Sequence, residues 1–487
     1  MDTSIEKWDF FELELTGPKG GNPFVDVRFG AAFRQGHRCV EVDGFYDGDG
    51  AYRVRFMPDT EGEWTCETCS NRAELAGRKA SFRCVSPGPG NHGPVLVSNR
   101  FHFAHADGTP HKSVGTTCYA WVHQGDALEE QTLATLRQAP FNKLRFCVFP
   151  KDYDYNRNDP ERYPFVKAPP AEGERYGWDF TRFDPAFWRH FERRVGQLRD
   201  LGIEADIIVF HPYDRWGFAR MPSEADDRYI RYLIARLAAF RNVWWSMANE
   251  YDFMQGKSAA DWDRYFALFQ RLDPYGRLRS IHNGHRFYDH ARGWVTHASV
   301  QHSDLGKVPE WRAQYGKPVV VDECCYEGNN RHCWGNITGE ELTRRCWRGC
   351  VGGGYVGHGE TYVNPEEILW WSKGGRLVGS SPARIAFLRK VLEEGPAEGL
   401  EPCASRVVPA ACEGCGCVGD GYFLAYFGIH QPASVQVHLP PGKRYRIEAI
   451  DTWNMTVQPV REAAEGSLEI ELPGRPYIAV RIVARRP

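Results

Sequence analysis

The chain has 487 residues, which is too long for one ordinary domain and predicts two or three. Its 42% hydrophobic and 25% charged residues are typical of a globular protein, so disorder is not expected. A net charge of -3 gives no basic surface for nucleic acid, and no run of about 18 apolar residues could cross a membrane. We expect neither kind of partner.

The cysteines and the N-terminus together indicate a cytoplasmic protein. Residues 1–7 have no apolar run of the signal-peptide type. Without such a signal, the 15 cysteines are most simply reduced thiols. Cys412, Cys415 and Cys417 lie on a Gly-rich loop without a second pair at zinc spacing, so a loop of small thiols is favoured over a metal site.

Residues 1–95 have the pattern of a small β-sandwich. Residues 8–15, 25–29 and 51–56 alternate apolar and polar positions, and glycines mark the turns between them. Residues 87–91, Pro-Gly-Pro-Gly-Asn, are typical of a linker.

Residues 96–398 alternate between predicted strands and helices. Strands are expected at residues 112–119, 142–149, 205–210, 243–248, 279–283, 299–302, 318–323 and 354–359. Helices fill most of the gaps, and the one at 185–201 has Asp184 as a plausible N-cap and proline at its first position. Eight such units match the size of a (β/α)8 TIM barrel. A doubly wound sheet is the alternative, but no dinucleotide fingerprint follows the first strand, so we expect no cofactor.

The last part, residues 399–487, returns to β texture. Predicted strands cover residues 422–427, 434–439, 445–450 and 477–483, which indicates a C-terminal β-sandwich. The expected fold class is therefore α/β, with a central barrel between two sandwiches. Such end domains also make a homo-oligomer possible.

Polar side chains follow many of the predicted barrel strands. In a TIM barrel the carboxyl ends of the strands carry the active site. The residues selected by this rule are Arg145, His211, Asn249, Glu250, His282, His285, His302, Glu323, His358 and Glu360. We add Trp121, which follows the first strand, as a sugar-binding candidate.

Two of these residues form a pair suited to glycoside hydrolysis. Glu250 ends the fourth strand and Glu323 the seventh. One carboxyl group must be protonated to assist the leaving oxygen, and the other must be ionised to attack or stabilise the sugar. Glu250, among Trp244, Trp245 and Tyr251, is expected to be the acid. Arg145 and His302 are expected to keep Glu323 ionised.

The Asn249–Glu250 pair on strand four, with Glu323 on strand seven, resembles the clan A glycoside hydrolases, which retain anomeric configuration. The resemblance implies that Glu250 is the acid/base, Glu323 the nucleophile and Asn249 the ligand of the sugar 2-hydroxyl. Arg145 and His211 resemble the clan's strand-two arginine and strand-three histidine, and His302 has the strand-six position.

The domain order is similar to that of the apiosidase-like hydrolases, including residues 61–65, Glu-Gly-Glu-Trp-Thr, in the N-terminal sandwich. The eighth strand departs from the clan, because it carries His358 and Glu360 where a tryptophan is common. Both are candidates for binding sugar hydroxyls. A carbohydrate is the expected substrate.

Two other functions remain open from the sequence. A carbohydrate-binding protein without turnover would suit the two sandwiches, although it need not keep both Glu250 and Glu323. A metal-dependent barrel hydrolase would use the histidines, although no HExxH or similar close spacing occurs. We therefore expect no metal.

Overall fold

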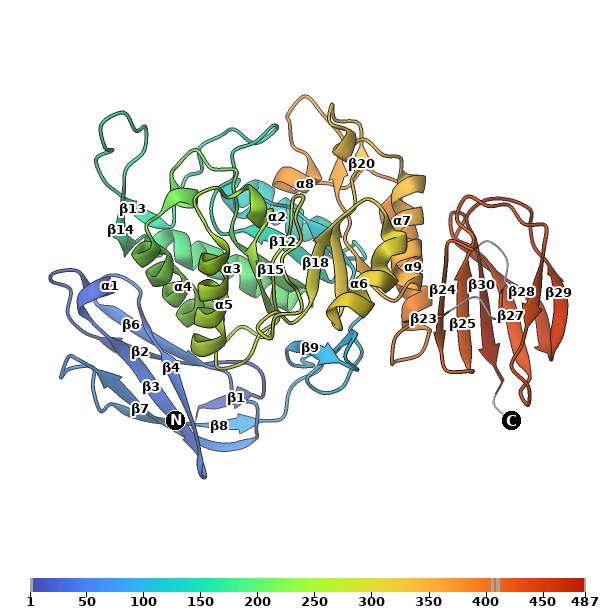
Figure 1. The fold of residues 1–487 in the computed structure, drawn as a ribbon. Helices are drawn as coiled ribbons and strands as arrows, with labels where there is room; N and C mark the ends of the chain where they lie inside the picture. Colours follow the sequence, from blue (N-terminus) through green and yellow to red (C-terminus); the bar gives the residue numbers. More distant parts are fainter. Residues whose placement is uncertain (1–2, 404–406, 409–411, 486–487) are drawn as a thin grey trace.

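The computed structural model describes residues 3–403, 407–408 and 412–485. Along the chain, two blue N-terminal sheets are followed by a central part of strands and helices and by a red β-rich part (Figure 1). No helix in these described residues has the length and apolar character needed to cross a membrane.

The N-terminal part consists of two sheets that share one core. The first has the strand order β1-β8-β7-β3-β4 and the second β2-β6-β5. Their bounds are β1 Ser4–Glu6, β2 Phe11–Thr16, β3 Phe29–Gln35, β4 Arg38–Asp43, β5 Phe45–Tyr46, β6 Ala51–Phe56, β7 Gly62–Ser70 and β8 Lys79–Val85. Trp64, Cys66 and Thr68 of β7 are buried while their neighbours are exposed, so period-two alternation directs one face into the core.

Eight strands of the central part form two parallel sheets, apart from a short parallel pair of β20 Glu327–Gly328 with β22 Glu360–Thr361. Five strands have the order β11-β12-β15-β16-β17, and three have the order β18-β19-β21. Their bounds are β11 Gly115–Thr117, β12 Lys143–Cys147, β15 Glu204–Phe210, β16 Val243–Ala248, β17 Arg279–Ser280, β18 Ala298–Gln301, β19 Val319–Glu323 and β21 Tyr355–Val356. A parallel bridge from Thr116 to His358 joins an edge of the first sheet to the residues after β21. The α/β class expected from the sequence is confirmed.

Helices connect most of these strands, as expected. They are α2 Asp126–Leu136, α3 Pro185–Asp200, α4 Ser223–Leu237, α5 Ala259–Leu272, α6 Val308–Tyr315 and α7 Gly339–Val351, and α9 Ser381–Glu393 follows the last strand. The predicted cap of α3 is confirmed, because the Asp184 carboxylate accepts a hydrogen bond of 2.9 Å from the Ala186 amide.

The fifth strand–helix unit differs from the expectation, because no helix occurs in the described residues 281–297. The Asp252 carboxylate accepts hydrogen bonds from three successive amides, those of Gly284, His285 and Arg286, at 2.6 to 2.8 Å. A carboxylate that collects these amides fixes an irregular loop in place of a helix.

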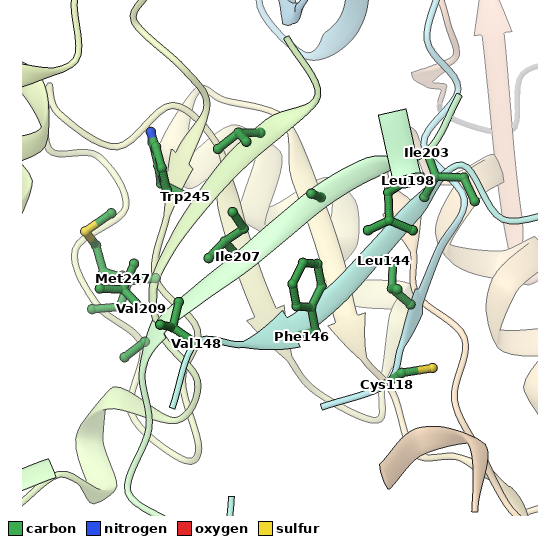
Figure 2. Close-up of a cluster of buried hydrophobic side chains, with 14 of the residues drawn as sticks. Cys118, Leu144, Phe146, Val148, Leu198, Ile203, Ile207, Val209, Trp245 and Met247 are labelled. Carbon is green, nitrogen blue, oxygen red and sulfur yellow. The ribbon is translucent and has the colours of Figure 1, made fainter. Parts of the chain in front are cut away.

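Alternation along the parallel strands separates an apolar face from a charged one. Figure 2 shows Leu144 and Phe146 of β12 in one cluster with Ile207 of β15 and Leu198 of α3. The intervening residues of these strands, which include Lys143, Arg145 and Asp206, therefore point to the opposite face.

A hairpin covers one end of the parallel strands. It consists of β9 Val95–Ser98 and β10 His102–His105. Its Val95 and Phe103 pack with residues near the amino ends of four strands, namely Trp244, Leu278, Val320 and Tyr355. The carboxyl ends remain available for a site.

The C-terminal part is a six-stranded sheet of order β23-β24-β25-β30-β27-β28, with a two-stranded sheet β26-β29. Their bounds are β23 Glu401–Pro402, β24 Gly414–Val418, β25 Tyr422–Tyr426, β26 Ser434–His438, β27 Tyr445–Asp451, β28 Thr456–Ala464, β29 Ser467–Glu471 and β30 Ile478–Ala484. Val435 and Val437 of β26 share a buried cluster with Ile447 and Val480 of the larger sheet, so one core lies between the two sheets.

Candidate active site

A buried layer of charges lies beneath the carboxyl ends of the strands. The Lys143 ammonium contacts Asp206 at 2.8 Å and Asp322 at 2.6 Å. Arg145 lies beside them, with Nε 3.5 Å from Asp206. Burial alone would raise the pKa of Asp322, but Lys143 and Arg145 outweigh it and hold that pKa below its ordinary value. This layer supports the site from below.

Glu250 follows β16 and has a left-handed backbone with φ of 49°. This conformation is uncommon for a residue with a Cβ and is enriched at functional sites. The Glu250 carboxylate accepts hydrogen bonds from the Tyr213 hydroxyl, from Asn249 Nδ2 at 3.0 Å and from Gln301 Nε2 at 3.2 Å. Its direction is therefore fixed by three donors.

Glu323 is the last residue of β19 and is 4% exposed. Burial raises its pKa to about 7, and the donor groups of Tyr326 and Trp334 only partly oppose this. Arg145 Nη1 and His282 Nε2 each lie 3.8 Å from Glu323 Oε1. The expected cationic neighbour is thus present in Arg145, but the pKa moves in the opposite direction to the one expected, because desolvation is the larger effect.

Two side chains connect the carboxylates. The Tyr119 hydroxyl contacts Glu323 Oε1 and lies 3.0 Å from Asn249 Oδ1, while the amide nitrogen of Asn249 donates to Glu250. A continuous path of hydrogen-bonding groups therefore runs from one carboxylate to the other through Tyr119 and Asn249.

Glu250 and Glu323 both line one pocket of about 530 Å³. Its walls are largely aromatic: Tyr119, Tyr153, Tyr213, Phe253, Tyr326, Trp334 and Trp371. The polar lining groups besides the two carboxylates are Lys151, Asp154, Asn249, His285, Gln301, Asn330 and His332. Flat rings with a few convergent polar groups suit a ligand that has apolar faces and hydroxyl edges.

His211, one of the predicted sugar ligands, lies outside the lining of this pocket. Its Nε2 lies 3.1 Å from the carbonyl oxygen of Phe149, and its side chain is buried. Burial lowers the pKa of His211 to about 3, so the imidazole is neutral. In the structure, His211 thus contacts the main chain at Phe149 and does not line the pocket.

His302 also lies elsewhere than the sequence argument expects. Its amide donates to the Glu323 carbonyl at 3.0 Å, but its ring nitrogen Nδ1 accepts from the Asp304 amide and its ring packs against Trp311. The pairing register of β18 and β19 shifts between Val300 and Gln301. This irregularity breaks strict alternation, and Gln301 is the residue that reaches Glu250.

Trp121 is fully buried and packs on Phe146, and its indole nitrogen donates to the carbonyl of Glu129. It is thus a core residue and does not line the pocket. The hydroxyl of Tyr119, two residues earlier, is the group that reaches the carboxylates from this part of the chain.

His358 and Glu360 are buried next to Glu327 and do not line the pocket. Glu360 accepts hydrogen bonds from the amides of Val378 and Gly379, and Glu327 accepts from those of Ser380 and Ser381. These amides precede or begin α9, so the two carboxylates hold the positive end of that helix. The predicted contact of Glu360 with sugar is replaced by this structural one.

Two groups of described residues have spacing that could hold a metal. They are Asp126, Glu129 and His190, and Glu327, His358 and Glu360. Arg194 occupies the first group, with contacts of 2.7 Å to Asp126 and 2.6 Å to Glu129. In the second group, the carboxylates of Glu360 and Glu327 accept hydrogen bonds from amides just before or at the start of α9. Neither group lines the pocket of Glu250 and Glu323.

Several pocket residues were missed by the strand-end rule. Tyr119 ends the first predicted strand, and the rule would have selected it had it been applied there. Lys151, Tyr213 and Gln301 lie in loops or at an irregular strand end, where only the folded loops reveal their direction.

Comparisons with known proteins identify the family of the central part. The family model described as "Apiosidase-like, catalytic domain" matches residues 97–380. Models for the domains of unknown function DUF5060 and DUF5605 match residues 4–71 and 412–483. A search of curated proteins returned no match.

Solved structures extend the likeness over the whole chain. A protein from Bacteroides vulgatus ATCC 8482 with a provisional glycoside hydrolase name is 39% identical, with 99% of this chain and 100% of that chain covered and a TM-score of 0.92. A family 5 glycoside hydrolase from the same organism is 14% identical, with coverages of 81% and 94% and a TM-score of 0.63. Another glycoside hydrolase is 13% identical, with coverages of 81% and 98% and a TM-score of 0.61. The last two show the fold alone.

The family match covers more than half of the chain, and a relative of the same length shares its fold closely. The chain therefore belongs to the apiosidase-like family and is a glycoside hydrolase.

Proposed function

We propose that this glycoside hydrolase works with retention of configuration, with Glu250 as acid/base and Glu323 as nucleophile. The observation that carries the proposal is the shared pocket: two buried carboxylates from the ends of β16 and β19 face one aromatic-lined space and are linked through Asn249 and Tyr119. Such a pair can protonate a leaving oxygen and attack the anomeric carbon.

We also propose the architecture that places this pair. The eight parallel strands would form a (β/α)8 barrel at residues 96–398, between β-sandwiches at 1–95 and 399–487. The Thr116–His358 bridge, which joins the first of these strands to a residue just after the last, supports closure on one side. The pocket then lies at the carboxyl ends of the strands, as active sites of such barrels do.

In the first step, Glu323 would attack the anomeric carbon while Glu250 gives its proton to the departing oxygen. In the second step, Glu250 would take a proton from water, which attacks the glycosyl-enzyme and frees Glu323. Asn249, which lies next to both carboxylates, would hold a sugar hydroxyl, and Arg145 would favour the ionised nucleophile.

The raised pKa of Glu323 is the one observation that favours exchanged roles, since a general acid must hold a proton near neutral pH. The Asn249–Glu250 sequence at the end of β16 supports the assignment proposed above, because it resembles the Asn–Glu pair of the clan A glycoside hydrolases, in which the Glu is the acid/base.

The proposal can be tested with a panel of aryl pyranosides and aryl furanosides. Wild type should release the aryl group from at least one sugar, and proton NMR should show that the first product keeps the anomeric configuration. Glu323→Gln should remove this activity and still fold, as judged by its melting temperature. An inverted product, or an active Glu323→Gln, would contradict the proposal.

A further inference from the structure

Lys151 is a buried cation in the wall of the candidate active site. It follows β12 by four residues, is 2% exposed and lines the pocket with Glu250 and Glu323. Among the described residues, its ammonium forms neither a hydrogen bond nor an ion pair with another side chain, although it lines the pocket. A largely buried ammonium needs stabilising neighbours, because burial disfavours its charge.

The neighbours are three tyrosine rings. The Lys151 ammonium lies 3.4 Å from the ring centroid of Tyr119, 4.4 Å from that of Tyr213 and 4.6 Å from that of Tyr153. All three distances are within the range in which a ring face attracts a cation. The rings thus provide the stabilisation that oxygen atoms do not.

Two of these rings carry the hydroxyls that hold the candidate catalytic carboxylates. Tyr119 contacts Glu323, and Tyr213 donates to Glu250. Tyr119 comes from the end of the first strand and Tyr213 from the loop after β15, and Asn249 and Glu250 also connect them. A single ammonium contacts the ring faces of both tyrosines.

We infer that Lys151 is a positioning residue, which holds Tyr119 against Glu323 and Tyr213 against Glu250 through its contacts with the two rings. Its effect on turnover rests on the proposed function of those carboxylates. Its effect on the two tyrosines does not.

The charge on Lys151 depends on pH in a useful range. Burial lowers its pKa to about 8, while Cys147 and Glu250 oppose this and Arg145 adds to it. The titratable and charged groups that face Lys151 are Tyr119, Arg145, Cys147, Tyr153, His211, Tyr213, Glu250 and His282. As the pH rises through about 8, the ammonium becomes a neutral amine that the ring faces no longer attract, so the positioning should be lost.

The test in solution compares Lys151→Met, Lys151→Arg and the control Lys112→Met on an aryl glycoside that wild type cleaves. Lys112 is also buried, but it donates to the carbonyls of Pro396 and Ala397, away from the pocket. Wild type should lose kcat above about pH 8. Lys151→Met should lower kcat about 10-fold or more at pH 7, and the ratio of wild-type to Lys151→Met kcat should shrink above about pH 8, because wild type then also loses the ammonium. Deprotonation of the proposed acid Glu250 lowers kcat in both proteins and cancels in this ratio. The ratio of wild-type to Lys151→Arg kcat should instead fall below its pH 7 value at that pH, because the arginine stays charged. Lys112→Met should keep the wild-type profile.

Crystal structures of the two Lys151 variants provide a readout that needs no substrate. In Lys151→Met, the hydroxyl of Tyr119 or Tyr213 should leave its carboxylate, and in Lys151→Arg both should stay. If both contacts persist in Lys151→Met, or if this variant keeps the kcat of wild type at pH 7 and above, the inference is overturned. A wild type inactive on every glycoside would instead count against the proposed function, and the crystal structures would still decide the role of Lys151.

Discussion

The Tyr119 hydroxyl and the Asn249 side-chain oxygen lie 3.0 Å apart, and this contact connects the two carboxylates of the site. Tyr119 touches Glu323, and Asn249 donates to Glu250. In the proposed reaction, Glu323 loses its negative charge while Glu250 gains one. One continuous set of side chains thus holds both carboxylates.

Removal of the Tyr119 hydroxyl should break the connection between Glu323 and Asn249. Tyr119→Phe keeps the ring over Lys151 but loses the contacts with Glu323 and Asn249, so we expect kcat to fall about 10- to 100-fold with little change in melting temperature. Tyr153→Phe is the matched variant, because Tyr153 contacts Lys151 while its buried hydroxyl has no hydrogen-bond partner among the described residues. Equal kinetic losses in both variants would contradict this prediction.

The roles of the two carboxylates can be separated by azide rescue. With an aryl glycoside that has a good leaving group, Glu250→Ala should still form the glycosyl-enzyme, and azide should then release a glycosyl azide of retained configuration. Glu323→Ala cannot form that intermediate, so azide should attack directly and give the inverted glycosyl azide. NMR of the products distinguishes the two. The opposite pairing of variant and product would show that the roles are exchanged.

The pH dependence of kcat/KM should reflect Glu323. A nucleophile must be ionised, and burial raises the pKa of Glu323 to about 7. Below that pH the free enzyme carries a proton on Glu323, so kcat/KM should fall toward acid with a limb near pH 7. Tyr326 lowers this pKa, so Tyr326→Phe should move the limb to higher pH. An acid limb near the ordinary glutamate pKa of about 4.3 would contradict the prediction.

The positions of Glu250, Asn249 and Glu323 could be predicted because they depend on strand periodicity alone. A near-continuous apolar strand that ends in a carboxylate puts that group at the edge of a parallel sheet, whatever the loops do. The same rule also covers Tyr119, which ends the first predicted strand.

The rest of the site depends on a register shift, on long-range contacts of loops and on burial, none of which strand periodicity predicts. The register shift after Val300 turns Gln301 into the pocket in place of His302. Glu360 is drawn away by amides at the start of α9, a helix about 20 residues further along the chain. Lys151 and Tyr213 lie on loops whose direction is set by long-range packing, and burial reversed the expected pKa shift of Glu323.

The charge layer below the pocket leads to a prediction about stability. Lys143 is fully buried and contacts both Asp206 and Asp322, so Lys143→Met would leave two buried carboxylates with Arg145 as their nearest cation. Breaking a buried ion pair from one side costs about 3–5 kcal/mol, and we expect a clear drop in the urea midpoint of the central part of the chain, followed by tryptophan fluorescence. Because paired apolar replacement is often nearly neutral, Lys143→Met combined with Asp206→Leu should recover part of the loss. Lys112→Met removes a buried lysine whose ammonium donates to the carbonyl oxygens of Pro396 and Ala397, so its midpoint should fall less. A Lys143→Met variant as stable as wild type would mean that Arg145 alone balances both carboxylates, and Arg145 would then be less free to favour an ionised Glu323.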